Sequence, residues 1–293
     1  MDSAPVLSWS LRRRKAGVRL SVTAWIGLTM AVVVIAVAVF GPLLAPQDPD
    51  ALVGSPFASP SGSHLLGLDY LGRDAFSRFL CGGQTTIVLA LLGTVLGGLI
   101  GIVTGTLAAY ARGFVDGIFN RTTEVLLSLP GLILILLFLG SFGTSLTVVV
   151  IAVGIANAPR VARIARGAAL DVRERAFVEL ARGRGERVYY ILFKEMLPNI
   201  AAPIGVDLGL RFTSSIIAVA SVSFLGLGLQ PPAADWGLII SENRSGLLLQ
   251  PWAVLLPVVA IGSLTVGVNL VMDGVSRRIG RSDQLLEADR SLR

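Results

Sequence analysis

The residue types that usually carry out chemistry are scarce in this chain of 293 residues. It has a single histidine, His64, and a single cysteine, Cys81, so it can build neither a multi-histidine metal site nor an internal disulfide. The remaining candidates are Asp207 and Arg211, which stand four residues apart beside an uncharged stretch. On a helix they share one face and can neutralise each other. Within a membrane, such a pair either stabilises the structure or contacts a substrate or another subunit.

These residues lie among long apolar segments, which must position them. The chain is 53% hydrophobic and 15% charged, with a mean hydropathy of +0.74, whereas soluble domains carry about 25% charged residues. A membrane helix needs about 20 predominantly apolar residues. We therefore expect an all-α polytopic membrane protein, because several long stretches contain no Asp, Glu, Lys or Arg: residues 22–47, 79–111, 125–159, 212–234 and 245–272.

The stretch 125–159 decides how often the chain crosses the membrane. It is too long for one upright span, and the sequence SFGTS at 141–145 suits a tight turn. Two spans at about 121–140 and 146–165 fit this stretch, which makes six transmembrane helices. With a cytoplasmic N-terminus, 21 of the 25 Lys and Arg residues then fall on the cytoplasmic side, as the positive-inside rule requires. A five-helix chain would place the most basic loop outside.

This topology divides the chain into three parts and makes both termini cytoplasmic. They are a cytoplasmic segment, a six-helix transmembrane domain and a cytoplasmic tail: residues 1–21, 22–276 and 277–293. Within the domain, an external loop spans 46–80 and a long cytoplasmic loop spans about 166–198. The external loop is a docking surface, an ordered cap over helix ends, or both. Its Asp74 and Arg78 have the i, i+4 spacing of a stabilising pair.

The cytoplasmic loop has helical rather than disordered character. Apolar residues recur at helical spacing before and after the sequence RGRGER at 182–187, whose two glycines suit a bend. Pro198 fits the first turn of the next transmembrane helix. We therefore expect a short helix, a bend and a second helix that enters the membrane. By charge alone this is a basic membrane-proximal loop, and its rigid shape also suits a docking surface.

A glycine repeat marks one face of the second uncharged stretch. Its members lie four residues apart, at Gly93, Gly97, Gly101 and Gly105. On a helix they form a groove that another helix can approach closely. The approaching helix belongs either to this chain or to another subunit.

Several motifs together resemble one family. The cytoplasmic loop resembles, in residue type and spacing, the Glu-Ala-Ala motif of bacterial ABC-importer permeases, at Glu179, Ala181, Gly185, Leu197 and Pro198. The stretches HLLGLDYLGRDAFSRFLCGG, AAYARGFVDGIFNR, FLGLGLQPPAADWG and VNLVMDG are also similar to the C-type permease subunits of dipeptide, oligopeptide and nickel importers. The resemblance covers about residues 20–276. The chain departs from the family at Leu180, where alanine is usual, and in its tail, which lacks the usual Asp-Pro.

The resemblance implies a type I ABC-importer permease fold in the bacterial inner membrane, and it implies partners. These are a sister B-type permease, two ATPase domains that dock on the cytoplasmic loop, and an extracytoplasmic solute-binding protein; lipid surrounds the subunit and no nucleic acid is expected. A P-loop needs Lys before Ser or Thr, but Lys15 precedes Ala16 and Lys194 precedes Glu195. We therefore expect no enzymatic activity and no cofactor in this chain, with ATP and Mg bound by the partner ATPases.

The expected cargo is a di- or oligopeptide or a similarly sized solute. Nickel, glutathione or haem are alternatives, and an ATP-independent secondary transporter is a less favoured class. Related permeases often carry an acid before the sequence FLGLG, near Ala218 and Val219, but both positions are apolar here. A pathway wall without this acid would discriminate weakly by charge. Alternatively, the two residues face lipid or another helix.

Overall fold

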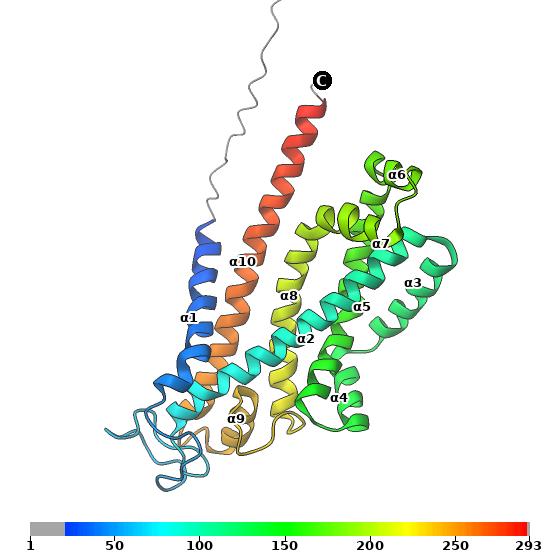
Figure 1. The fold of residues 1–293 in the computed structure, drawn as a ribbon. Coiled ribbons are helices and arrows are strands. Elements are labelled where there is room, and N and C mark those ends of the chain that lie inside the picture. Colours follow the sequence, from blue (N-terminus) through cyan, green and yellow to red (C-terminus); the bar gives the residue numbers. More distant parts are fainter. Residues whose placement is uncertain (1–20, 292–293) are drawn as a thin grey trace, which may run out of the picture.

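The computed structural model describes residues 21–291, with side chains to residue 279, and this range is helical and contains no strand (Figure 1). The predicted segment 1–21 lies outside it except for Ser21, whose hydroxyl caps α1. Five of the described helices are long and apolar enough to cross a membrane, and six if α3 and α4 form one broken span. The elements are α1 (Val22–Leu44), α2 (Ala75–Ala111), α3 (Gly113–Ser128), α4 (Gly131–Phe142), α5 (Leu146–Arg173), α6 (Ala176–Gly183), α7 (Val188–Tyr190), the π-helix η1 (Ile191–Met196), α8 (Leu197–Phe224), α9 (Trp236–Asn243), the 3-10 helix η2 (Arg244–Gly246) and α10 (Trp252–Ser291).

The predicted span at 121–140 is wrong in detail, because a helix break divides it. α3 and α4 meet at an angle of 88°, and Pro130 precedes the first residue of α4. Leu129 has extended backbone (ψ 132°), as expected because proline disfavours the helical conformation in the residue before it. The predicted turn at 141–145 is confirmed, since α4 ends there and Gly143 has a φ of +87°.

α2 and α5 form the central helix pair, and they pack almost backbone to backbone. A Cβ atom added to Gly105 would lie 2.3 Å from the carbonyl oxygen of Ala162 on α5. Small residues on α5 therefore face small residues on α2, which permits the close approach. The sequence left open whether the helix in the glycine groove belongs to this chain or to another subunit. The structure shows that it is α5 of the same chain, which packs against all four glycines: Gly93, Gly97, Gly101 and Gly105.

α1 and α10 form a second pair, on the left in Figure 1. Here too glycines meet, and a Cβ on Gly27 would lie 2.6 Å from the carbonyl oxygen of Gly267. α10 continues beyond residue 276 as far as Ser291. The start predicted for the cytoplasmic tail, residue 277, therefore falls inside a continuous helix.

The cytoplasmic loop contains two bends where the sequence predicted one. α5 continues to Arg173, so the apolar repeat expected to form a separate short helix belongs to the end of a long one. α6 follows the first bend, and residues 184–187 form the second. The helix is then continuous from Val188 to Phe224. Within it, α8 begins at Leu197, and its first turn contains Pro198 as predicted. The missing N–H of Pro198 removes one backbone bond, and the widened turn η1 lies just before it.

Candidate functional site

α6 stands out from one end of the molecule as a short arm (Figure 1). Two of its residues, Val178 and Ala181, are fully buried against the end of α5 and against η1. The opposite face is exposed and carries Glu179 and Leu180, and the Leu180 side chain is 65% exposed. The arm is therefore fixed on one side and open on the other.

Contacts with the ring and the carbonyl oxygen of Tyr110 hold the arm against the end of α2. The guanidinium of Arg182 lies over the ring of Tyr110, 4.3 Å from its centre. The carbonyl oxygen of Tyr110 accepts hydrogen bonds from Arg173 (3.1 Å) and Arg182 (3.4 Å). Cations near the last carbonyls of a helix are favourable because those carbonyls lack helical partners. Some of the basic charge of this loop thus holds the arm in place.

The second bend depends on the backbone of Gly185. Its φ is +75°, a conformation that other residues adopt at a cost. Its N–H donates to the carbonyl oxygen of Arg182 (2.9 Å), and the N–H of Glu186 donates to that of Ala181 (3.2 Å). A Cβ at Gly185 would meet no atom within 4 Å, so the constraint on this position within the chain is conformational, with open space around it.

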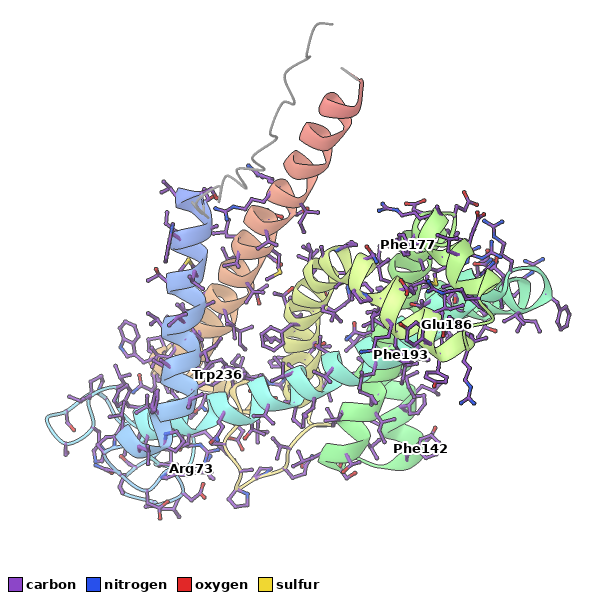
Figure 2. All side chains as sticks on the ribbon, turned by 45° about the horizontal axis from the view of Figure 1, so that its top comes forward. Arg73, Phe142, Phe177, Glu186, Phe193 and Trp236 are labelled. Carbon is purple, nitrogen blue, oxygen red and sulfur yellow. The ribbon has the colours of Figure 1, made fainter. Side chains whose placement is uncertain are left out.

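The residues of the predicted coupling motif divide between the two faces of this region. Ala181 and Leu197 pack inward, whereas Glu179, Gly185 and Pro198 are exposed. The sequence missed the apolar part of the exposed surface. Besides Leu180, this part comprises side chains that are at least half exposed, namely Tyr189 and Phe193, the latter marked in Figure 2. The two aromatic residues in a strongly basic loop were the available signal.

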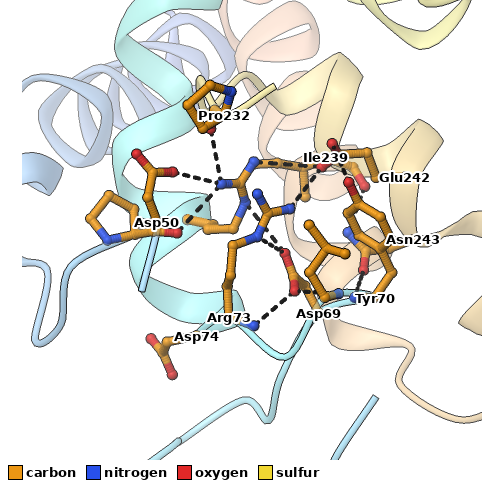
Figure 3. Close-up of polar contacts among 12 residues, drawn as sticks. Asp50, Asp69, Tyr70, Arg73, Asp74, Pro232, Ile239, Glu242 and Asn243 are labelled. Atoms are coloured by element: carbon orange, nitrogen blue, oxygen red, sulfur yellow. Dashed lines mark hydrogen bonds and ion pairs between the residues drawn. The ribbon is translucent and has the colours of Figure 1, made fainter. Parts of the chain in front are cut away.

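The loop before α2 is an ordered cap at the end of the molecule opposite α6 (Figure 1). Arg78 is fully buried, and it lies within ion-pair distance of Asp50 (3.1 Å), Asp69 (3.5 Å) and Glu242 (3.5 Å). Arg73 pairs with Asp69 (2.7 Å) and Glu242 (3.2 Å). Figure 3 shows Arg73 of this network with its partners Asp69 and Glu242. The network joins the loop to α9 although the partners are far apart in sequence.

The predicted pair of Asp74 and Arg78 does not form. The carboxylate of Asp74 instead caps α2, accepting from the N–H (2.8 Å) and the hydroxyl (2.7 Å) of Ser77. The first N–H groups of a helix lack helical partners and favour such a cap. This leaves Arg78 to pair with carboxylates on other segments. α2 also begins at Ala75, so the last residues of the predicted loop 46–80 are helical.

A second buried acid holds the start of α9. Asp235 accepts from the hydroxyl of Thr86 on α2 (2.6 Å) and from the N–H of Leu238 (3.1 Å). Burial raises the pKa of the Asp235 carboxyl, and these hydrogen bonds oppose the shift. The next residue, Trp236, donates its indole N–H to the carbonyl oxygen of Phe79 (3.0 Å). The cap, α2 and α9 are thus tied together by polar contacts on both sides.

Within the bundle, Asp207 and Arg211 are paired as their spacing predicted, with Nε of Arg211 3.3 Å from Oδ1 of Asp207. Arg211 also lines a cavity of about 380 Å³ between α4, α5 and α8, and Ala218 lines it too. Val219 does not, because it is 1% exposed and packs in the apolar core. Of the two alternatives stated for Val219, the structure therefore shows packing against other helices of this chain.

The cavity contains two residues that the sequence analysis did not assign to a site. Asn157 lines it from α5, and so does Arg160. The structure places it within α5, fourteen residues after Leu146. An asparagine inside an uncharged stretch, with an arginine one turn later, was the signal that could have found them.

The comparison with known families decides what this arrangement belongs to. Residues 97–281, more than half of the chain, match the family described as the binding-protein-dependent transport system inner membrane component. The chain belongs to this family. It is 38% identical over 216 residues to the glutathione transport system permease protein of Pectobacterium atrosepticum, covering 74% of this chain and 72% of that one. Over 270 residues it is 34% identical to the "Probable D,D-dipeptide transport system permease protein" of Escherichia coli strain K12, covering 92% and 88%.

The fold of this permease agrees with its family. An amino acid ABC transporter determined with histidines has a chain that superposes with a TM-score of 0.52 at 21% identity, covering 69% of the permease and 94% of that chain. The protein is thus an inner-membrane permease subunit of an ABC importer, with the type I fold, and is not itself the ATPase. The α6 arm and the cavity lie within the matched residues, whereas the loop of the cap precedes them.

Proposed function

We propose that this permease and a sister B-type permease form the pathway for di- or oligopeptides, or a solute of similar size. An extracytoplasmic binding protein delivers the cargo, and two ATPase domains drive its passage. Support comes from relatives whose names include glutathione and D,D-dipeptide transport. Glutathione is itself a peptide-sized solute and is the second candidate, ahead of nickel or haem. We propose no catalysis and no cofactor for this chain, and assign ATP and Mg to the ATPases.

The observation that carries the coupling role is the two-sided α6 arm. Its exposed apolar residue, Leu180, stands on a projecting helix, where an apolar side chain favours a protein partner. Its buried residues, Val178 and Ala181, pack against α5 and η1. A displacement of the arm by a docked ATPase therefore moves α5 and the start of α8 with it, because packed interiors transmit strain. ATP shifts the permease between inward and outward states only if the ATPases bind them with different affinity.

Substitutions in the arm test this role. Leu180→Asp places a charge on the apolar face, and Gly185→Leu strains the backbone at φ +75° and adds bulk to the exposed bend. Both should reduce ATPase co-purification and peptide uptake by about tenfold or more, while the permease still inserts into the membrane. Leu180→Ala, the residue usual in the family, should retain both activities. Arg163→Ala, at an exposed position on α5, is the matched control.

The cargo is tested in a strain that lacks peptide importers and carries the complete system with its own binding protein. Uptake of a labelled dipeptide should appear with the wild-type permease and fall when unlabelled peptide competes. If glutathione or a nickel chelate competes and peptides do not, the peptide assignment is wrong. If Leu180→Asp and Gly185→Leu recruit the ATPase normally, docking occurs elsewhere.

A further inference from the structure

Two arginines line the cavity between α4, α5 and α8 at about the same height along the helix axes. The side-chain amide of Asn157 donates to the hydroxyl of Ser215 (2.8 Å), which fixes the register of α5 against α8. Arg160 lies three residues after Asn157, and Arg211 lies four residues before Ser215. The helices pack antiparallel here, so both arginines lie about one turn from the same bond, in the same direction. Both line the cavity.

The two arginines differ in their charge balance. Arg211 is paired with Asp207. The side chain of Arg160, by contrast, has no ion pair or hydrogen bond within the range whose side chains are described. None of the residues lining the cavity is acidic, and apart from the two arginines they are small, polar or aliphatic. The cavity therefore keeps one uncompensated positive charge.

The surroundings of Arg160 strengthen its electrostatic interactions and hold its guanidinium in place. The wall is mainly apolar and lies among membrane-spanning helices, where a charge is poorly screened and an unpaired one is costly. A Cβ on Gly131 would lie 3.5 Å and 3.7 Å from the two terminal nitrogens of Arg160, so the guanidinium rests against the start of α4. The hydroxyls of Ser214 and Ser221 already donate to carbonyls of their own helix. Unlike these hydroxyls, the guanidinium of Arg160 has no acceptor among the described residues, so its N–H donors are free.

We propose that Arg160, with the Arg211–Asp207 pair beside it, forms an anion-recognition station in the pathway, which accepts the carboxylate of passing cargo. A guanidinium offers two parallel N–H donors that match a carboxylate. The inference rests on the proposed function, since peptides and glutathione carry a free carboxylate. It replaces the expectation of a wall that discriminates weakly by charge, which relied on positions 218 and 219 alone.

The first experiment compares uptake of a labelled peptide with uptake of its C-terminally amidated form by the complete importer. The binding protein is the same in all strains, so its own preference cancels in the ratio between variants. Arg160→Gln should lower uptake of the free acid relative to the amide by about tenfold, the scale of a lost hydrogen bond to a charged group. Arg160→Lys should retain most of the preference. Arg163→Gln, on the exposed side of α5, should leave the ratio unchanged.

A second measurement does not depend on the cargo. With Cys81→Ala as background, Ala218→Cys places a thiol in the cavity of the assembled importer. An anionic thiosulfonate reagent should react with it faster, relative to a cationic one, when Arg160 is present than in Arg160→Gln, by about tenfold. Inorganic phosphate tests whether the station also binds free anions. If it does, phosphate should slow the reaction of the anionic reagent; if the station binds only the carboxylate of cargo, phosphate should leave that rate unchanged.

Each result decides something separate. If the wild-type importer takes up neither peptide form, the proposed cargo is wrong, and the reagent ratio still tests the station. If Arg160→Gln reduces both peptide forms equally and weakens co-purification of the sister permease, Arg160 pairs with that subunit and the proposal fails. An unchanged reagent ratio at Ala218→Cys would also overturn it.

Discussion

The close packing of α2 on α5 makes a sharp prediction at Gly105. A Cβ at this position would lie 2.3 Å from the carbonyl oxygen of Ala162, 3.0 Å from its carbonyl carbon and 3.1 Å from its Cα. All three are backbone atoms, so no side-chain rotation can relieve the clash. Restoring ordinary contact requires the helices to separate by about 1 Å, and contacts along their interface weaken as a result. Gly105→Ala should therefore destabilise the permease by about 1–3 kcal/mol, toward the upper end of this range.

Gly167→Ala is the matched control. Gly167 lies inside α5, is exposed, and would meet no atom within 4 Å if it carried a Cβ. Alanine is favoured over glycine in an exposed helix by about 0.5–1 kcal/mol, so this variant should be neutral or slightly more stable. The two substitutions add the same methyl group, and only the surroundings differ.

The assay is the fraction of detergent-solubilised permease that stays monodisperse by size-exclusion chromatography after heating. The melting midpoint should fall by several degrees for Gly105→Ala and stay level or rise for Gly167→Ala. Equal midpoints would refute the claim that backbone contact between α2 and α5 sets the stability of this pair. A fall in both would point to a requirement for helix flexibility instead.

Two further predictions concern the cap and the topology. Arg78→Ala leaves the buried carboxylates around it, including that of Glu242, with too few partners and should cost about 3–5 kcal/mol; thermal stability in detergent measures this, and a loss below 1 kcal/mol would contradict the network. In a Cys81→Ala background, a cysteine replacing Ser59 should react with an impermeant thiol reagent in intact cells. One replacing Arg175 should react only after permeabilisation, and labelling at Arg175 from outside would overturn the topology.

Several features follow from short stretches of sequence, because their causes are local. The membrane class follows from the length of uncharged segments, and the turn at 141–145 follows from its small and polar residues. Gly185 could be placed at a bend because its neighbours are helical in character on both sides. The motif around Glu179 carried the family resemblance in the same way. None of these depends on which helix packs against which.

Other features depend on contacts between distant segments. Asp74 and Arg78 have the spacing of a helical pair, yet Asp74 caps its own helix and Arg78 pairs with Glu242 across the cap. Nothing in the spacing of Arg78 and Glu242 could predict that contact. The break at Pro130 is a local signal, whereas the 88° angle between α3 and α4 is seen only in the folded chain.

The sequence by itself determined that this is a helical membrane permease of the ABC-importer class, and it located the α6 arm approximately. Only the tertiary structure decided which membrane residues face the cavity. Ala218 lines it and Val219 lies in the core, although both are apolar neighbours on one helix. In a soluble protein, polar residues would mark the outer face of such a helix. Lipid is as apolar as the core, so this pattern is lost, and only packing shows that Arg160 and Arg211 line the same cavity.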